Sequence, residues 1–460
     1  MNKQLTVKDI LLVTNGTLIN GNEDIICEGF SRDSREIKEK DTYIGIKGSK
    51  VNGNELYEEV LKKGATCLIL EDVTVPEKVL RKYPEAAIII VENTIKALQQ
   101  IAEYKRSLYN IPVVAITGSV GKTSTKDIVA SVLAQKYKVL KTQGNYNNNI
   151  GLPLTILNLR DHDALVVELG MSSLGEISAI SKIAKPTIAI ITNVGTAHIG
   201  NLSSRENILK AKLEILEGLD KDGVLIINND NDLLHNWYIG NECKFTVVTY
   251  GIKNESDLMA ENIQLNENDS VFTAKSKNDK YEVKIKVAGE HFVYNGLCAI
   301  TVGRELNIDS EKILKGLTDF ELTKGRMENV TTNKGIFLIK DCYNANYDSM
   351  KAAIEYLSKL SNQRKIAVLG DMLELGEYSK KLHEMVGEEV KKNSIDILIT
   401  VGEEAKNIAK KADVKETYIC DNNKEAEKIL KKILGKGDAV LIKASNGMRF
   451  TDICEFIEKM

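Results

Sequence analysis

A glycine-rich turn joins an apolar run to an amphipathic run in the stretch VAITGSVGKTSTKDIVASVL, residues 114–133. Glycines at positions 118 and 121 let backbone N–H groups point inward, where they can bind phosphate oxygens. Lys122 can reach the β- and γ-phosphates of a nucleotide, and the hydroxyl of Thr123 can bind Mg²⁺. A helix that begins here directs its positive end at the same anion. The stretch therefore predicts a phosphate-binding loop between a strand and a helix.

The loop departs from the full motif G-x-x-x-x-G-K-[ST] at one position. That motif would place a glycine at Ile116, which here belongs to the preceding apolar strand. The alternative interpretation is a glycine-rich turn without a ligand. An ATP site alone does not name a reaction, because kinases, ligases, switches and motors all have one.

A lysine lies on the apolar face of a second segment, SRENILKAKLEILEGLD, residues 204–220, which we interpret as one helix. At about 100° per residue, Lys212 falls about 40° from Ile208, inside the apolar arc, whereas Lys210 falls on the charged face. An ammonium group among apolar neighbours is costly unless it is paired, reaches solvent or loses its charge. A lysine with a lowered pKa can also react with CO₂ to give a carbamate, which could bind Mg²⁺. A lysine whose stem packs and whose ammonium reaches solvent is the alternative.

Two more candidate ligands end predicted strands of the same sheet. Glu168 ends the run in VVELGMSS, and His198 follows another in TNVGTAH. Ligands gather at the carboxyl ends of strands in open α/β sheets, and a carboxylate oxygen suits Mg²⁺. Either residue alone could be a hydrogen-bonded polar group. Together they favour a metal site formed by Thr123, Glu168, His198 and Lys212.

The elements that must position these residues form an α/β pattern. Apolar strands alternate with amphipathic helices after Pro112, which predicts a doubly wound domain with a parallel sheet, and a second α/β unit follows. A polar stretch from about Asn254 to Asp279 and a predicted strand at YEVKIKVAG follow within the same domain. We place three domains at 1–110, a small α/β module, at 111–326, the P-loop domain, and at 327–460, a Rossmann-like domain.

Composition limits the classes of function. The 460 residues are 43% hydrophobic and 28% charged with a net charge of −3, which gives no basic surface for nucleic acid. No apolar run approaches the roughly 20 residues of a membrane span, and the N-terminus has no secretion signal. Seven dispersed cysteines argue against a disulfide framework and against a zinc site. We expect a cytoplasmic enzyme, a monomer, that acts on small molecules.

The motifs taken together resemble the Mur ligase family, the ATP-dependent amide-forming enzymes of peptidoglycan synthesis. TGSVGKTST, GNYNNNIGLP, VVELGMSSLGEI, TNVGTAHIG and KAKLEI occur in the family's order, and the resemblance covers nearly the whole chain. It implies ATP and Mg²⁺ as cofactors and a carbamylated lysine at Lys212. It also implies that a carboxylate is activated as an acyl phosphate before the amide forms.

The C-terminal half is similar to members that add D-alanyl-D-alanine to UDP-N-acetylmuramoyl-tripeptide. DCYNANYDSM, VLGDMLELG and LHEMVGEE carry this similarity, whereas relatives that add one amino acid, and folylpolyglutamate synthetases, tend to have a D-x-A-H-x-P type sequence at residues 341–346. The resemblance therefore implies these two substrates. The alternatives are another Mur-type amino-acid ligase, a ligase like folylpolyglutamate synthase, and a non-catalytic P-loop nucleotide switch. The chain departs from common family patterns at VNGNEL and KASNGMR.

The resemblance assigns roles residue by residue. It implies catalytic roles for Lys122, Glu168, His198, Lys212 and Arg326, and UDP contacts for Ser34 and Arg35. It places Asn145 and Asn148 near the γ-phosphate, Asn193 and Asn295 near adenine, and Arg326 on the phosphates. The residues expected to bind the nucleotide are Gly118, Ser119, Val120, Gly121, Lys122, Thr123, Ser124, Asn145, Asn148, Asn193, Asn295, Arg326, Asp341, Tyr343 and Asn344.

Overall fold

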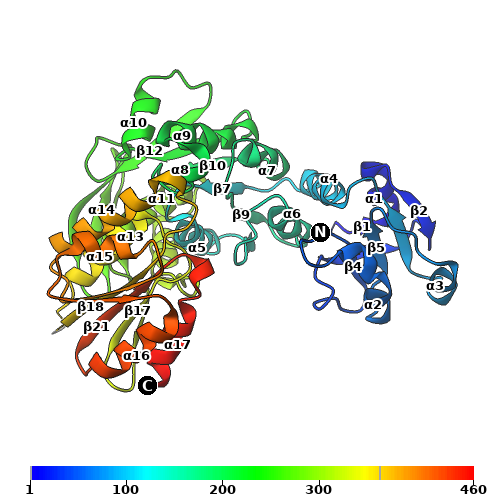
Figure 1. Ribbon diagram of the computed structural model, residues 1–460. Helices are drawn as coiled ribbons and strands as arrows, with labels where there is room; N and C mark the ends of the chain where they lie inside the picture. The colour runs from blue at the N-terminus through cyan, green and yellow to red at the C-terminus, as the bar shows by residue number, and fades with distance from the viewer. Residues whose placement is uncertain (1–2, 362–363) are drawn as a thin grey trace.

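Three β-sheets organise the chain, each flanked by helices. The computed structural model describes residues 3–361 and 364–460. In Figure 1 the N-terminal sheet, in blue, lies at one end, and the yellow-to-red C-terminal sheet lies beside the green and cyan central one. The three-domain α/β fold predicted from the sequence is confirmed. The boundaries near residues 110 and 326 stay predictions.

The N-terminal sheet has six strands in the order β1-β3-β4-β5-β6-β2. Its inner strands are short and apolar; β5, for example, is buried along its whole length. The elements are β1 (Leu5–Thr6), β2 (Thr17–Asn20), β3 (Ile26–Ser31), β4 (Asp41–Ile44), β5 (Cys67–Leu70), β6 (Ala87–Ile90), α1 (Val7–Thr14), α2 (Tyr57–Lys62), α3 (Glu77–Lys82) and α4 (Thr94–Ser107).

The central sheet has nine strands in the order β15-β14-β13-β12-β11-β10-β7-β9-β8, parallel from β8 to β13. Its middle strands are runs of β-branched and aliphatic residues buried on both faces, as parallel strands covered by helices must be. They are β7 (Val113–Thr117), β8 (Val139–Lys141), β9 (Ala164–Glu168), β10 (Ile188–Ile191), β11 (Val224–Asn228), β12 (Thr246–Gly251), β13 (Leu258–Leu265), β14 (Ser270–Lys275) and β15 (Lys280–Ile285).

The polar stretch at residues 254–279, for which no strand was predicted, contains two strands. The antiparallel strands β13 and β14 occupy most of this segment and extend the sheet to β15. The segment looks polar because part of β13 is exposed and because the turn between the two strands, residues 266–269, consists of polar residues. The average polarity of the segment therefore gave no indication of the hairpin.

Helices cover both faces of the central sheet. One sequence prediction needs correction here, because residues 204–220 are not one continuous helix: α9 ends at Leu213 and a 3₁₀ turn follows at Glu214–Glu217. The helices are α5 (Lys122–Leu133), α6 (Gly151–Leu157), α7 (Glu176–Ala184), α8 (Ile199–Leu202), α9 (Arg205–Leu213), α10 (Asp232–Ile239), α11 (Glu290–Glu305) and α12 (Ser310–Asp319).

The C-terminal sheet has six strands in the order β16-β17-β21-β18-β19-β20, and only β16 is antiparallel to its neighbour. Its elements are β16 (Glu328–Thr331), β17 (Phe337–Lys340), β18 (Arg364–Gly370), β19 (Ile397–Val401), β20 (Glu416–Cys420), β21 (Asp438–Lys443), α13 (Tyr347–Ser358), α14 (Ser379–Lys392), α15 (Lys406–Ala412), α16 (Asn423–Ile433) and α17 (Thr451–Lys459).

The C-terminal domain packs closely on the central one. The Tyr356 hydroxyl donates to the Glu267 carbonyl at 3.0 Å, and the Thr196 N–H donates to the Asp348 carboxylate at 3.0 Å. Gly195 makes the second contact possible, because a Cβ there would lie 2.2 Å from Asp348 Oδ2. The N-terminal domain, in contrast, lies beyond the far side of the central sheet, near α6 (Figure 1).

The packing of α12 on the phosphate-loop helix α5 gives a stability prediction. A Cβ on Gly316 would lie 2.5 Å from the Val132 Cα, so Gly316→Ala forces the two helices apart. We expect a loss of about 1–3 kcal/mol in the free energy of unfolding. Urea denaturation followed by fluorescence of Trp237, the single tryptophan and part of the same domain, measures it.

The exposed neighbour on α12 supplies the control, since Lys315→Ala should change the stability by less than about 0.5 kcal/mol. Equal midpoints for Gly316→Ala and Lys315→Ala would contradict the close packing of these helices.

Candidate active site

The phosphate loop lies between β7 and α5, as predicted. Gly121 adopts φ +83°, a conformation that favours glycine, immediately before the helix. The backbone N–H groups of Lys122, Thr123 and Ser124, in the first turn of α5, have no acceptor among the described residues. Unpaired N–H groups at a helix N-terminus form a site for an anion. The loop therefore has the donors that a phosphate requires.

The loop is held in shape by the segment that follows β10. The side-chain amide of Asn193 accepts from the Val120 N–H and donates to the Val120 carbonyl, both at 2.9 Å. The Ser119 hydroxyl accepts from the Gly195 N–H at 2.9 Å. Asn193, Val120 and Ser119, all predicted to bind the nucleotide, thus also form the hydrogen bonds that fix the turn.

The Thr123 hydroxyl contacts one of the other predicted metal residues, Glu168, and also Arg326. It donates to Glu168 Oε2 at 2.9 Å and accepts from the guanidinium of Arg326 at 3.3 Å. The amide of Asn147 donates to Glu168 Oε1 at 2.9 Å. The sequence analysis missed Asn147, although it lies in the Asn-rich loop between Asn145 and Asn148.

These groups fit a magnesium ion by the chemistry of their donors. Thr123 and Glu168 place a hydroxyl and a buried carboxylate together, and Mg²⁺ prefers such hard oxygen ligands. Across the described ranges, 3–361 and 364–460, no three histidine, cysteine or acidic side chains cluster as a metal centre. Phosphate oxygens and water must therefore complete the coordination of an ion bound here, as is usual for Mg²⁺ with a nucleotide.

Lys212 lies inside the protein, as its place on the helix predicted. Only 1% of it is exposed, so the alternative in which its ammonium reaches solvent is wrong. No hydrogen bond or ion pair with another described residue holds this ammonium. Burial lowers the pKa of Lys212 well below its usual value, and the charge of Lys122 lowers it further. The neutral, nucleophilic amine is thereby favoured.

His198 lies where the central and C-terminal domains meet. Its backbone is left-handed, with φ +64°, and its Nδ1 lies 2.7 Å from Oε2 of Glu374. Burial lowers the pKa of His198, Lys122 lowers it further, and Glu374 acts in the opposite direction. His198 therefore contacts the loop that follows β18 and lines the same cavity as Glu168.

Lys122 extends over the loop, and its Nζ donates to the Gly118 carbonyl at 2.7 Å. Burial lowers the pKa of Lys122, the charge of Glu168 raises it, and Arg326 lowers it. A bound phosphate would offer this ammonium a stronger partner than a neutral carbonyl.

A cavity of about 480 Å³ brings most of the predicted site residues together between the two domains. The central domain contributes the phosphate loop, the Asn-rich loop and the ends of β9 and β10, and the C-terminal domain contributes three loops. The predicted residues that line it are Ser119, Val120, Gly121, Lys122, Thr123, Asn145, Asn148, Glu168, His198, Arg326, Tyr343 and Asn344.

A smaller cavity of about 130 Å³ opens beside the phosphate loop. Asn193, Asn295 and Asp341, all predicted to bind the nucleotide, line it. Asn295 Oδ1 accepts from the Thr125 hydroxyl at 3.0 Å, but its buried Nδ2 has no partner among the described residues. An unpaired buried donor is costly, so this amide fits a ligand that carries an acceptor.

The C-terminal domain contributes a buried ion pair that the sequence did not reveal. Lys443, at the end of β21 and 1% exposed, donates to Asp341 Oδ2 at 2.5 Å and to the Asn344 carbonyl at 3.1 Å. The guanidinium of Arg326 lies 4.0 Å from the centre of the Tyr343 ring. Ligands bind at the carboxyl ends of strands in open sheets. The position of Lys443 at the end of the predicted strand AVLIKAS could therefore have indicated a site residue.

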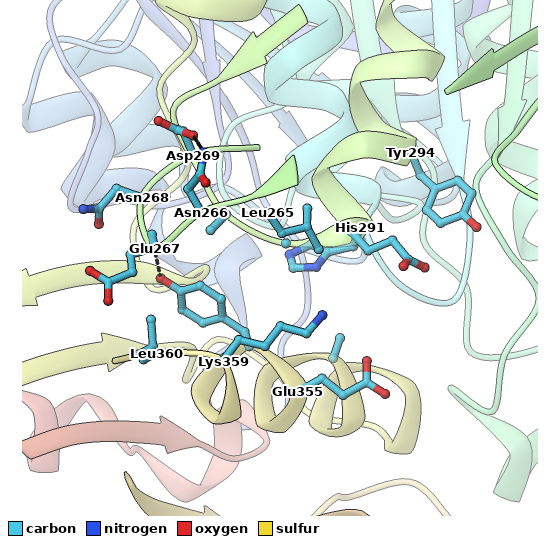
Figure 2. A pocket seen from close by; sticks show the side chains of 15 residues that line it. Leu265, Asn266, Glu267, Asn268, Asp269, His291, Tyr294, Glu355, Lys359 and Leu360 are labelled. Atoms are coloured by element: carbon cyan, nitrogen blue, oxygen red, sulfur yellow. Dashed lines mark hydrogen bonds between the residues drawn. The ribbon is translucent and has the colours of Figure 1, made fainter. Parts of the chain in front are cut away.

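A larger cavity, of about 640 Å³, lies behind the small one (Figure 2). His291 and Tyr294 border both, and the turn at residues 266–269 and the helix α13 form the other walls. The Tyr356 hydroxyl, on α13, donates to the carbonyl of Glu267, which Figure 2 labels at the edge of this space. The small cavity therefore adjoins the larger one at His291 and Tyr294, on the side away from the phosphate loop.

The predicted UDP residues lie apart from the phosphate loop, in the N-terminal domain. A cavity of about 770 Å³ is lined by Arg35 and, from the central domain, by Tyr146 and Arg160. Ser34 is buried and does not line this cavity. The hydrogen bond from Arg35 lowers the pKa of Asp33 to about 2, so the two form a charged pair at the rim.

Comparison with known proteins agrees with this geometry. Three family models match consecutive parts of the chain: the Mur ligase family catalytic domain at residues 28–106, the Mur ligase middle domain at 116–303, and the Mur ligase glutamate ligase domain at 325–446. The UDP-N-acetylmuramoyl-tripeptide–D-alanyl-D-alanine ligase of Bacillus subtilis is 37% identical over 456 residues, 97% of each chain. The chain belongs to the Mur ligase family.

Solved Mur ligase structures share the whole architecture. MurF from Acinetobacter baumannii aligns with a TM-score of 0.89 at 28% identity and covers all of both chains. MurF ligase from Thermotoga maritima in complex with ADP gives 0.82 at 29% identity and covers 94% of this chain and 97% of its own. A relative of the same kind from Escherichia coli is 31% identical over 420 residues, 90% of this chain and 89% of its own.

The buried pair of this Mur ligase gives a second prediction. Asp341→Ala leaves the Lys443 ammonium buried without its carboxylate, which should destabilise the C-terminal domain by about 3–5 kcal/mol. Replacing both residues, as Asp341→Ala with Lys443→Met, should recover most of this loss because no charge stays buried. Amide hydrogen exchange of β17 and β21 measures it.

Lys391→Ala, at an exposed ion pair with Asp413, is the control and should leave the exchange unchanged. A single Asp341→Ala variant whose β21 exchanges as slowly as in the parent would contradict the importance of this pair.

Proposed function

We propose that this Mur ligase joins D-alanyl-D-alanine to UDP-N-acetylmuramoyl-tripeptide with the energy of ATP. The observation that carries the proposal is the cavity between the domains, where the phosphate loop and Glu168 face the three loops of the C-terminal domain. The full-length similarity to ligases of this name, and to a MurF ligase solved with ADP, supports the same reaction.

In the first step the terminal carboxylate of the tripeptide attacks the γ-phosphorus of ATP. A carboxylate–phosphorus bond forms, the bond to the β-phosphate oxygen breaks, and ADP leaves. The loop N–H groups, Lys122 and Arg326 stabilise the charge that spreads over the phosphoryl oxygens. Bound Mg²⁺ would be held by Thr123 and Glu168 and would neutralise phosphate charge.

In the second step the amine of D-alanyl-D-alanine attacks the carbonyl carbon of the acyl phosphate. The new C–N bond forms as the C–O bond to phosphate breaks, and the amine proton passes to solvent or to a nearby base. Water must be kept out meanwhile, because it would hydrolyse the acyl phosphate. We propose that the N-terminal domain, which holds the UDP end near Arg35, moves toward the other two domains during the reaction.

We propose that the small cavity beside the phosphate loop holds the adenine base. The unpaired amide of Asn295 would donate to a ring nitrogen, and Asp341 and Lys443 border the same cavity from the C-terminal domain. The ribose, which joins adenine to the phosphates, would lie toward the residues of the phosphate loop that line the same cavity, Val120, Gly121 and Thr123.

We propose further that Lys212 is carbamylated and that this group adds a negative charge beside the metal site. Its burial and the neighbouring positive charge of Lys122 support the proposal, because both favour the neutral amine that reacts with CO₂. A carbamate would also restore charge balance beside Lys122 and Arg326.

We propose that the enzyme acts in the cytoplasm, where ATP and nucleotide-linked precursors occur. We also propose that it is a monomer. None of the helices within the described ranges combines the length and apolar character that a membrane span needs. All seven cysteines lie within those ranges as free thiols, which suits a reducing compartment.

The reaction can be tested directly with ATP, UDP-N-acetylmuramoyl-tripeptide and D-alanyl-D-alanine. We expect the pentapeptide product by mass spectrometry and ADP release that requires both other substrates. ADP release at the same rate without them would support the switch, and product formation only with single amino acids would support another ligase of the family. Tripeptides ending in diaminopimelate or in lysine define the third residue.

The carbamate leads to a separate prediction for Lys212→Ala. The variant should lose product formation by about 10²-fold or more while it still binds ATP, because the loop donors are unchanged. A small carboxylate such as acetate should restore part of the rate. With ¹³C-bicarbonate, the parent should show a carbamate carbon resonance in NMR that the variant lacks.

Lys210→Ala, on the exposed face of the same helix, is the matched control and should behave as the parent. A fully active Lys212→Ala variant would rule out the carbamate role.

A further inference from the structure

We propose that Asp127 is a positioning residue that fixes the linker between the central and C-terminal domains and, through it, sets the place of Arg326. Asp127 lies on the phosphate-loop helix α5 and does not line the cavities that hold the predicted site residues. The inference rests on the proposed ligase function, since Arg326 is assigned to the phosphates there.

Asp127 holds the linker by two hydrogen bonds to one residue. Its Oδ2 accepts from the Thr323 N–H at 3.0 Å and from the Thr323 hydroxyl at 2.8 Å. Thr323 lies in the segment between α12 and β16, outside both domains' regular structure. With 2% exposure, the carboxylate is shielded from water, so these bonds do not compete with solvent.

Two cations keep Asp127 ionised in this buried place. Lys141 Nζ lies 2.8 Å and Lys126 Nζ 3.2 Å from the same oxygen, Oδ1. Burial alone would raise the pKa of Asp127, but these lysines and the bond from Thr323 together lower it. A charged acceptor makes stronger hydrogen bonds than a neutral one, so the linker is held firmly.

Arg326 lies between two anchored points of the linker. On one side Thr323 is bound to Asp127, and on the other the Met327 N–H donates to Asp341 Oδ1 at 3.3 Å. Between them Gly325, at φ +74°, forms the turn from which the Arg326 side chain reaches the Thr123 hydroxyl. The first anchor belongs to the central domain and the second to the C-terminal domain.

The spacing of Thr123 and Asp127 along α5 explains how this helix contacts the linker at two points. Thr123 and Asp127 are four residues apart, so they lie one turn, about 5.4 Å, from each other on the same face. Thr123 contacts Arg326 and Asp127 contacts Thr323, three residues earlier in the linker. The helix and the linker therefore run side by side and meet at two points. Loss of the contact between Asp127 and Thr323 would leave the linker bound to α5 only through Arg326.

The hydrogen-bonded side chains around Asp127 are also connected to the strand that carries Glu168. Lys126 also donates to the Thr142 carbonyl at 3.1 Å, and the Thr142 hydroxyl accepts from the Glu168 N–H at 3.1 Å. Thr142 follows β8, the neighbour of the strand that carries Glu168. One buried network thus supports both groups that contact the Thr123 hydroxyl.

The kinetic consequence follows from the role of Arg326. Ground-state binding of ATP depends largely on the loop N–H groups and Lys122, which the linker does not touch. A misplaced Arg326 would mainly weaken the stabilisation of charge that develops during phosphoryl transfer. Loosening the linker should therefore lower kcat more than it raises KM for ATP.

Thr323→Val tests the proposal with little change in shape, because it removes only the hydroxyl that binds Asp127. We expect kcat to fall about 10-fold with KM for ATP changed by less than about 3-fold. Thr323→Ser, which keeps the hydroxyl, should restore kcat to near the parent value. Thr318→Val is the matched control, since that hydroxyl bonds only within α12, to the Leu314 carbonyl at 3.0 Å.

Asp127→Asn gives a second, stronger perturbation, and ADP binding by calorimetry reports whether the phosphate loop is intact. We expect a larger fall in kcat than for Thr323→Val, with ADP affinity within about 3-fold of the parent. An unchanged kcat in Thr323→Val, an equal fall in Thr318→Val, or no recovery in Thr323→Ser would overturn the proposal. A parent enzyme that makes no product would instead contradict the ligase function itself.

Discussion

An excess of basic side chains over carboxylates around the phosphate loop is the constraint on which the site depends. Lys122, Lys212 and Arg326 converge near the phosphate loop, and Glu168 is the one carboxylate that binds the Thr123 hydroxyl between them. Buried charges are stable only when they are paired or neutralised. ATP brings the missing negative charge as phosphate, and carbamylation of Lys212 would bring more. The same imbalance therefore favours phosphate binding and transfer.

The fold brings these charges together from separate parts of the chain. Parallel strands place the phosphate loop, Glu168 and the His198 segment at one edge of the central sheet, as the carboxyl ends of such strands require. The C-terminal domain then covers this edge, and Gly195 permits the close contact with Asp348. The N-terminal domain, which carries the proposed UDP cavity, lies apart in this conformation (Figure 1).

The sequence predicted what depends on local pattern. The phosphate loop follows from its spacing, and the burial of Lys212 follows from helical periodicity. It could not reveal contacts between distant segments, such as Lys443 with Asp341 or Thr323 with Asp127, because either partner alone resembles an ordinary polar residue. The hairpin of β13 and β14 was not predicted for another reason, since its turn and part of β13 are polar and exposed. Asn147 was missed because three neighbouring asparagines offer the same chemistry.

The central claim is that ATP activates the tripeptide carboxylate as an acyl phosphate inside this cavity. Transfer of ¹⁸O from a tripeptide labelled in both oxygens of the attacking carboxylate tests it most directly. The attacking oxygen stays with phosphorus when the amine displaces phosphate, so the account predicts one ¹⁸O in each inorganic phosphate released and one in the new amide. Inorganic phosphate without ¹⁸O, formed together with the amide product, would contradict it.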